Sequence, residues 1–479
     1  MLRRTKIVAT LGPASSDQKV LEQMIRAGVD LVRMNFSHGT AQDHVSRAET
    51  VRAAAKACGR TVGILADLQG PKIRVKKFAN DKIVLNNGDT FILDASLEGL
   101  GNQERVGLDY KELPNDVSVG TVLLLNDGML EFHVTGVKGT QVICKVVRGG
   151  VLSNNKGINR KGGGLTAPAL TDKDKEDIKT AALIKADYLA VSFPRSGDDM
   201  RHARELMHAA GGKSLLMAKI ERAEAIPALG DIIDASDAIM VARGDLSVEV
   251  GDAAVPGLQK RMITMARAKN RLVITATQMM ESMITNPIPT RAEVSDVANA
   301  VLDGTDAVML SAETAVGDYP VETIEAMARI CLSAEREDHE RPMDPRDAKH
   351  KFTRIDQSIA MSALFAASHF KVKAIVALTQ SGSTPLWMSR ISVGVPIFAL
   401  TPLRETLSKV TLFSGVHPIE FHSKSRGQAE EWHQIEGTLL DLGLVEEGDM
   451  VVMTIGEAVG KAGHTNTMKI MRVGDHHKS

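Results

Sequence analysis

The first 340 residues repeat one pattern: a short run of Val, Ile, Leu and Met, a polar loop, and a segment with helical periodicity. Eight apolar runs stand out: KIVATLG, LVRMNFS, VGILADL, YLAVSF, SLLMAKIE, AIMVARGD, RLVITATQ and AVMLSAE. Continuous apolar runs are typical of parallel strands buried on both faces. Eight such strands alternating with helices predict a (β/α)₈ TIM barrel, and an open doubly wound sheet is the competing fold.

The segments between the runs carry helix signals. Residues 18–30 place their apolar side chains on one stripe, and Gly28 suits the C-terminal cap of that helix. Residues 171–186 open with Thr171, an N-cap residue, followed by an acidic first turn. Both segments therefore predict amphipathic helices that cover the barrel.

A long β-rich segment follows the third run. It contains tight-turn signals at Asn87-Gly88 and Asp127-Gly128, which predict hairpins in an inserted all-β domain. Because barrel active sites lie on the loops that follow the strands, a domain inserted there is placed to act as a lid.

The barrel pattern stops near Arg341. A helix pattern over residues 354–370 precedes strand patterns in KAIVALTQ, PIFALTP, VHPIEF and DMVVMTIGE, which predict a C-terminal open α/β domain. The predicted boundaries are 1–70 and 167–340 for the two parts of the barrel, 71–166 for the inserted domain and 341–479 for the C-terminal domain.

Composition narrows the possible partners. Lys plus Arg number 58 and Asp plus Glu 59, and aromatic residues are 3%, so neither a basic surface nor stacking platforms indicate nucleic acid. No run of 18 apolar residues predicts a membrane span. Three scattered cysteines, Cys58, Cys144 and Cys331, favour a reducing cytoplasm over a disulfide framework.

Polar residues gather at the ends of the predicted barrel strands. They are Arg33, Asn35 and Ser37 on the second strand, Asp67 on the third, Lys219 and Glu221 on the fifth, Gly244 and Asp245 on the sixth, Thr275 and Thr277 on the seventh, and Ser311 and Glu313 on the eighth. An edge ion pair or a helix cap would explain single members of this set. Unpaired buried charges are costly, so their number at one rim favours a shared site.

The residue types in this set suit phosphate chemistry. Glu221 and Asp245, from adjacent strands, would form a small oxygen site for Mg²⁺ or Mn²⁺. Lys219 leaves the same strand face as Glu221, and with Arg33 it would neutralise a phosphoryl group beside that metal.

Several segments resemble, in order and spacing, the signature segments of the pyruvate kinase family. They are KIVATLGPAS, VRMNFSHG, DLQGPKIR, AKIERAEAI, VARGDLSVEVG, TATQMMESMI and MLSAETAVGDYP. The resemblance covers nearly the whole chain and is nearest to bacterial members with a regulated C-terminal domain. It implies transfer of the phosphoryl group of phosphoenolpyruvate to ADP, the last step of glycolysis, by a cytoplasmic homotetramer that uses Mg²⁺ or Mn²⁺.

The resemblance also implies residue roles. By this resemblance, Glu221 and Asp245 bind the divalent metal, and Arg33 binds the substrate phosphate. The N–H groups of Gly244 and Asp245, together with Thr277, bind the substrate carboxylate. Lys219 stabilises the charge of the phosphoryl group during transfer. Thr277 and Ser311 are both candidates for the path that protonates the enolate. The resemblance implies a nucleotide site formed by Arg74, Lys156, Thr10, Pro13 and His38. It also implies a K⁺ site formed by Asn35, Ser37, Asp67 and the carbonyl of Leu68.

Three positions depart from the family pattern. Ser247 replaces a usual glycine, at a cost of about 1 kcal/mol if that position needs a positive φ. Leu68 replaces a usual threonine, and Lys72 stands where K⁺-dependent members have glutamate. Because the charge of a lysine can stand in for the ion, we predict a weak or vestigial K⁺ site and catalysis without K⁺.

The C-terminal domain carries a candidate effector site. In ALTQSGSTPLWMSR a strand is followed by a turn and a helix start, a geometry that suits the phosphate of a sugar phosphate or nucleotide monophosphate. The turn residues are Ser381, Gly382, Ser383 and Thr384. Plain capping of the helix explains the same residues and remains open.

Two other readings of the whole chain compete with a kinase. A metal-dependent lyase or aldolase of pyruvate-like substrates would explain Glu221 and Asp245 but not the lid or the C-terminal domain. A barrel kept only as a regulatory binding module would be expected to lack part of the charged set, and no member of that set is missing from the sequence.

Overall fold

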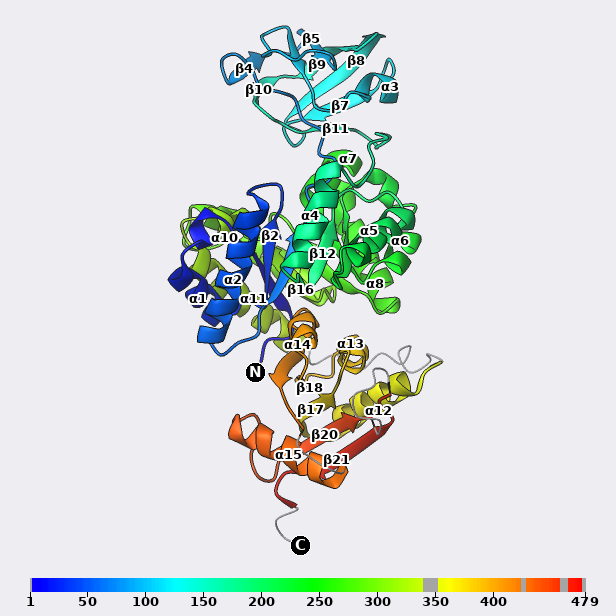
Figure 1. Ribbon diagram of the computed structural model, residues 1–479. Coiled ribbons are helices and arrows are strands. Elements are labelled where there is room, and N and C mark those ends of the chain that lie inside the picture. The colour runs from blue at the N-terminus through cyan, green and yellow to red at the C-terminus, as the bar shows by residue number, and fades with distance from the viewer. Residues whose placement is uncertain (1, 339–351, 424–427, 457–463, 476–479) are drawn as a thin grey trace.

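The computed structural model describes residues 2–338, 352–423, 428–456 and 464–475 (Figure 1). Eight parallel strands close into a barrel in the order β1-β16-β15-β14-β13-β12-β3-β2, which confirms the predicted TIM barrel and rules out the open sheet. The strands are β1 (Lys6–Thr10), β2 (Leu31–Asn35), β3 (Gly63–Asp67), β12 (Tyr188–Val191), β13 (Leu215–Ile220), β14 (Ala238–Ala242), β15 (Leu272–Ala276) and β16 (Ala307–Leu310).

Helices surround the barrel. The longer ones are α1 (Gln18–Ala27), α2 (Ala41–Ala57), α4 (Asp172–Leu183), α5 (Gly197–Ala209), α8 (Val255–Ala268), α9 (Arg291–Leu302) and α11 (Pro320–Asp338). Shorter helical segments are η1 (Pro13–Ser15), η2 (Ala223–Ala225), α6 (Leu229–Ala235), α7 (Arg243–Val250), η3 (Asp252–Ala254), η4 (Glu281–Ile284) and α10 (Ala312–Ala315). The predicted caps are confirmed: Gly28, at φ 130°, ends α1, and the Thr171 hydroxyl accepts the Asp174 N–H at the start of α4.

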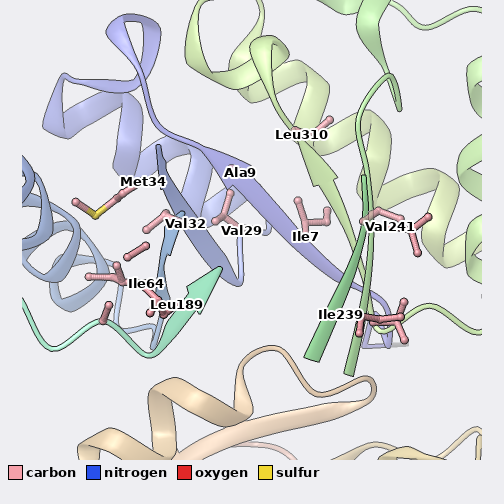
Figure 2. Close-up of a cluster of buried hydrophobic side chains, with 14 of the residues drawn as sticks. Ile7, Ala9, Val29, Val32, Met34, Ile64, Leu189, Ile239, Val241 and Leu310 are labelled. Atoms are coloured by element: carbon pink, nitrogen blue, oxygen red, sulfur yellow. The ribbon is translucent and has the colours of Figure 1, made fainter. Parts of the chain in front are cut away.

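Alternate side chains of the barrel strands enter two different cores. Ile7 and Ala9 of β1 belong to the cluster between the strands and the helices, part of which Figure 2 shows. Val8, between them, belongs to a second cluster inside the barrel. This division explains the absence of polar alternation in the eight runs, since each strand is buried on both faces.

The inserted segment forms a β-rich lid that Figure 1 shows beyond one end of the barrel. A six-stranded sheet has the order β11-β7-β8-β9-β5-β6, and β10 pairs with β4. The strands are β4 (Lys82–Leu85), β5 (Thr90–Asp94), β6 (Arg105–Gly107), β7 (Val122–Leu125), β8 (Leu130–Lys138), β9 (Gln141–Arg148), β10 (Gly150–Ser153) and β11 (Ile158–Arg160), and α3 (Leu113–Asp116) adds one helical turn. The lid has its own core around Phe91 and Phe132. Its exact limits, predicted as 71 and 166, stay predictions.

The C-terminal domain is an open α/β sheet at the other end of the barrel (Figure 1). Its strand order is β19-β18-β17-β20-β21, with β21 antiparallel. The elements are α12 (Ile355–His369), β17 (Val372–Leu378), α13 (Ser383–Ser389), β18 (Ile397–Thr401), α14 (Arg404–Val410), β19 (Val416–Glu420), α15 (Gln428–Asp441), β20 (Met450–Ile455) and β21 (Thr467–Arg472). The predicted boundary at 340/341 lies outside the described residues.

The barrel interior and the C-terminal domain share one apolar cluster, which joins the two units at the barrel floor. Polar contacts cross the same junction. Lys6 Nζ donates to the Val416 carbonyl at 2.6 Å, and the Tyr188 hydroxyl donates to the Lys409 carbonyl at 2.6 Å. Across the described ranges, no helix is long and apolar enough to span a membrane.

Candidate active site

The polar residues at the strand ends lie on the same side of each strand as the side chains that fill the barrel interior. Met217 of β13 belongs to the interior cluster, and Lys219 and Glu221 follow it with the same parity. Leu31 is followed in the same way by Arg33 on β2. A strand therefore changes from an apolar to a charged inner face within two residues, at the end of the barrel nearer the lid.

Lys219 is the most enclosed cation of this mouth. Its Nζ lies 2.8 Å from Glu221 Oε1, 3.4 Å from Asp67 Oδ1 and 2.8 Å from the Ser192 hydroxyl. Burial alone would lower the pKa of Lys219, but Asp67 and Glu221 outweigh it and hold the pKa above its ordinary value. The ammonium is therefore charged at neutral pH and fixed in direction.

Arg33 completes the positive side of the mouth. Its Nε donates to Asp67 Oδ2, and its Nη1 donates to the Thr10 hydroxyl at 3.2 Å. Burial opposes ionisation of Asp67, yet Arg33 and Lys219 together hold its pKa below the ordinary value. Thr10 in turn donates to the Leu310 carbonyl at 2.8 Å, so the ends of β1, β2 and β16 are tied together.

Glu221 and Asp245 form the acidic side. Glu221 Oε2 accepts the Phe193 N–H at 3.0 Å, and the side chain is buried. Burial is the main cause that raises the pKa of Glu221, and the charge of Asp245 adds to it although Lys219 opposes both. Two carboxylates that repel each other suit a divalent cation whose other ligands come from substrate and water. Among the residues with described positions, no group of three or more His, Cys, Asp or Glu forms a denser metal cage.

The loop after β15 presents Thr277 to the start of α7. The Thr277 hydroxyl accepts the Gly244 N–H at 2.8 Å and donates to the Ala276 carbonyl at 2.6 Å. Thr277 and Gln278 both have left-handed backbones, at φ 67° and 54°. Two adjacent residues of this kind without glycine are strained, and such strain concentrates at functional sites.

Arg243 is a site residue that the sequence reasoning missed. Its Nη2 donates to the Thr277 carbonyl at 2.8 Å and its Nε to the Ala276 carbonyl at 3.3 Å, while Nη1 binds Asp296 at 2.7 Å. The guanidinium therefore braces the strained turn. Its position next to Gly244 was the only sequence signal that could have indicated this role.

The two segments that connect the lid to the barrel pair through their backbones near Arg74 and Lys156. Arg74 bridges to Gly157 and its Nη1 donates to the Asn155 carbonyl at 3.0 Å, while Val75 N donates to the Lys156 carbonyl at 2.9 Å. The two cations thus lie on paired segments at the base of the lid.

Lys72, on the same connection, extends towards the barrel. Its Nζ lies 3.1 Å from Asp245 Oδ1 and 3.9 Å from Asp127 Oδ1, and its side chain is 27% exposed. The lysine therefore faces the mouth and pairs with one of the candidate metal carboxylates.

Other residues of the predicted set are less central. Pro13 in η1 and His38 after β2 are exposed at the rim, and Ser311 caps α10, where its N–H donates to Glu313 at 2.7 Å. The prediction that Thr275 lies at the rim is wrong. Its side chain lies on the outward-facing side of its strand, within the wall of the barrel. It is fully buried, with its hydroxyl 3.1 Å from that of Thr305.

Two further expectations are settled by local geometry. Glu313 is also buried, in the short helix α10 after β16, where it accepts the N–H of Met280 at 3.2 Å in addition to that of Ser311. Ser247 lies inside α7 with no positive φ and donates to the Gly244 carbonyl at 2.8 Å. The strain considered for Ser247 is therefore absent.

The candidate K⁺ oxygens already have protein donors. Asn35 Oδ1 accepts the Ser37 N–H at 3.1 Å, and the Leu68 carbonyl accepts the Ser192 hydroxyl at 2.7 Å. Asp67, as described, pairs with Arg33 and Lys219.

The candidate effector turn leads into α13, which begins at Ser383. The hydroxyls of Ser381 and Ser383 are 3.0 Å apart, and Gly382, at φ 83°, donates its N–H to the Thr379 hydroxyl at 2.9 Å. Thr384 is buried, with its hydroxyl 2.7 Å from that of Thr465. The turn therefore offers exposed hydroxyls on a fixed base.

The fold and mouth are those of a barrel enzyme with clustered cations and carboxylates at the end of the barrel nearer an inserted lid. Comparison with known proteins gives the family. The profile of the pyruvate kinase barrel domain matches residues 2–324, and that of the pyruvate kinase alpha/beta domain matches residues 357–471. The chain belongs to the pyruvate kinase family.

Individual relatives agree with the profiles over nearly their full lengths. Pyruvate kinase II of Salmonella typhimurium is 55% identical, with 98% of this chain and 99% of the relative aligned. Pyruvate kinase of Haemophilus influenzae is 57% identical (95% and 96% aligned), and that of Mycobacterium intracellulare is 42% identical (99% of each). The lyase or aldolase alternative finds no support in these comparisons.

Proposed function

We propose that this chain transfers the phosphoryl group of phosphoenolpyruvate to ADP, giving pyruvate and ATP. The observation that carries the proposal is Lys219, held charged between Asp67 and Glu221 at the mouth of the barrel. The bond between the substrate's enol oxygen and phosphorus breaks, and a bond forms to a terminal phosphate oxygen of ADP. Lys219 and Arg33 stabilise the charge on the moving group and on the enolate left behind.

Glu221 and Asp245 would hold Mg²⁺ or Mn²⁺, and their mutual repulsion supports this assignment. Such a cation would supply positive charge that offsets the charge of the phosphoryl group. The N–H groups of Gly244 and Asp245 at the start of α7, with Thr277, would bind the substrate carboxylate, which then replaces the hydrogen bond between Gly244 and Thr277. Thr277 and Ser311 remain the candidates for delivering a proton to the enolate through water.

The nucleotide would bind between the lid and the rim. Arg74 and Lys156, on the paired segments at the lid base, are placed to contact its phosphates when the lid closes. The assignments of Thr10, Pro13 and His38 rest on the family motifs, and the positions of η1 and of the loop after β2 at the rim are in keeping with them.

We also propose that catalysis needs no K⁺. Lys72 places a cation 3.1 Å from Asp245, and protein donors already occupy the oxygens of Asn35 and Leu68. A weak monovalent site at Asn35, Ser37, Asp67 and Leu68 would then contribute little.

The C-terminal domain would regulate the enzyme through a phosphorylated effector at Ser381–Thr384, supported by the exposed serine hydroxyls of that turn. A cytoplasmic homotetramer is the proposed assembly. Two exposed apolar surfaces of this domain support it: Ile355 and Phe365 on α12 are 69% and 55% exposed, and Ile470 lies on the edge strand β21.

A coupled assay of the purified full chain tests the proposal. Pyruvate should form only when phosphoenolpyruvate, ADP and Mg²⁺ or Mn²⁺ are all present, with one ATP formed for each pyruvate. Pyruvate release that is independent of ADP would instead indicate a lyase or a phosphatase.

A further inference from the structure

Glu249 connects three segments at the base of the lid. It lies in the last turn of α7 and is 6% exposed. Its Oε2 accepts the Ala223 N–H of η2 at 2.8 Å, and its Oε1 is 3.4 Å from the amide nitrogen of Asn159 on β11. Its backbone carbonyl accepts the Gly162 N–H at 3.0 Å. Glu249 therefore links α7 to η2 of the barrel, to strand β11 of the lid and to the segment that follows β11.

The hydrogen bond between Ala223 and Glu249 connects the two segments that carry the acidic groups of the mouth. Asp245 precedes Glu249 by four residues, about one turn of the same helix, and Glu221 precedes Ala223 by two residues. The hydrogen bond from Ala223 to Glu249 therefore ties the loop that carries Glu221 to the helix that carries Asp245. This bond adds a direct link between the two loops beyond the pairing of β13 with β14.

The lid returns to the barrel at the same place. Gly162, Gly163 and Gly164 have φ values of 79°, 81° and 96°, a backbone that other residues rarely adopt. A β-carbon on Gly163 would lie 2.6 Å from the carboxylate of Glu224, so the chain passes tightly over the loop after β13. The Gly164 N–H donates to Glu224 as well. The glycine joint is thus anchored on the segment that Glu249 holds.

Burial of an ionised carboxylate at this position is energetically unfavourable. Burial, reinforced by the nearby Glu224 and opposed by Arg222, raises the pKa of Glu249 to about 7. An apolar side chain would avoid this cost but would leave the partly buried N–H of Ala223 without its acceptor.

We propose that Glu249 is a positioning residue: it fixes Glu221 against Asp245 for the divalent cation and couples that geometry to the glycine joint of the lid. The inference deepens, and rests on, the proposed metal role of Glu221 and Asp245. Groups that orient metal ligands typically change metal affinity by 10–100-fold when removed.

Binding of Mn²⁺ to the full chain without substrates, followed by electron paramagnetic resonance, tests the inference. Glu249→Ala should weaken Mn²⁺ binding about tenfold. Ala223→Pro removes the donor and leaves the carboxylate, and should weaken binding to the same extent. Proline suits this place because Ala223 opens η2 and Arg222, at φ −119° and ψ 149°, has the backbone that precedes proline. The double variant should bind no more weakly than either single variant.

Two controls separate the possible failures. Glu335→Ala removes another buried glutamate that accepts backbone N–H groups, those of Arg4 and Thr5, at the barrel floor, and should leave Mn²⁺ binding within about twofold. Glu221→Gln should abolish tight Mn²⁺ binding. Unchanged binding in Glu221→Gln would overturn the metal site itself and the inference with it. Loss in Glu221→Gln with unchanged binding in the Glu249 or Ala223 variant, or additive effects in the double variant, would overturn only the role of Glu249.

A second readout follows the lid. Hydrogen exchange of segments 158–166 and 222–226 should become faster in Glu249→Ala but not in Glu335→Ala. Exchange that changes in neither segment would contradict the coupling to the glycine joint.

Discussion

Lys219 and Lys72 each pair with one of the two proposed metal carboxylates, and their surroundings give them different tasks. The side chain of Lys219 is 11% exposed and has three fixed partners, Glu221, Asp67 and Ser192. The side chain of Lys72 is 27% exposed and belongs to the connection into the lid. A buried, preorganised charge suits the moving phosphoryl group, whereas a more mobile one suits replacement of an exchangeable ion.

Lys72 gives a test of independence from K⁺. Turnover of the unmodified chain in a buffer free of K⁺ and Na⁺ should rise less than about tenfold on addition of ~100 mM KCl at equal ionic strength, since screening is then constant. Lys72→Glu should make turnover partly dependent on K⁺, because two carboxylates then face each other without the ammonium. Lys76→Glu, a matched change at a lid lysine that pairs with Glu98 at 2.7 Å, should not. A larger K⁺ response of the unmodified chain would show that Lys72 does not replace the ion.

The turn after β15 shows why strand ends are harder to predict than strands. The eight apolar runs, the Gly28 cap and the Thr171 cap follow from local chemistry, and all are confirmed. Its position near the end of the strand alone predicted Thr275 at the rim, yet its side chain is buried in the wall. The left-handed backbone at Thr277 breaks the alternation, and a long-range contact from Arg243 supports it, which no local pattern reveals.

Arg243 and Gln278 test this turn. Arg243→Ala removes a charge-assisted hydrogen bond worth about 1.5–3 kcal/mol, so the KM for phosphoenolpyruvate should rise at least about tenfold, with a smaller change in kcat. Adding Gln278→Gly should recover part of the loss, because glycine adopts a positive φ without strain. Gln278→Gly alone serves as the control and should stay close to the unmodified chain. An unchanged KM in Arg243→Ala would refute the bracing role.

The turn before α13 carries the regulatory prediction. Replacing Ser381, Ser383 and Thr384 with alanine removes the two exposed serine hydroxyls that would bind an effector phosphate and the buried Thr384 hydroxyl that supports the turn. Activation by sugar phosphates or nucleoside monophosphates should disappear, while turnover without effector should be retained. Activation that persists in the triple variant would place the effector elsewhere and leave helix capping as the role of these residues.

At the scale of the whole molecule, the barrel carries a different unit at each of its two ends (Figure 1). The lid lies beyond the mouth, and the C-terminal domain shares its apolar core with the barrel interior (Figure 1). Arg390, at the end of α13, donates to buried Asp306 beside the start of β16. A path of packed contacts therefore leads from the candidate effector turn to the barrel. The sequence predicted the three units, but their junction depends on contacts between distant segments.

Lys6 provides a pH test of that junction. Burial is the main cause that lowers its pKa from 10.5 to about 8, although Asp30 opposes the shift. Between pH 8 and 10.5 the unfolded chain therefore binds this proton and the folded chain does not. The Lys6 contribution to the free energy of unfolding should accordingly rise with pH across that window. Lys6→Met should remove this rise, measured by denaturant unfolding at several pH values. Equal pH slopes in both proteins would contradict the assignment.

The most direct test of the account is the turnover of Lys219→Met in the coupled assay for pyruvate. The change keeps the length of the side chain and removes the charge, so kcat should fall by at least about 10²–10³-fold, the effect expected for one preorganised charge contact. Mn²⁺ binding should largely survive because Glu221 and Asp245 remain. Turnover within about tenfold of the unmodified chain, with the variant folded and Mn²⁺ bound, would contradict the central role of Lys219 in phosphoryl transfer.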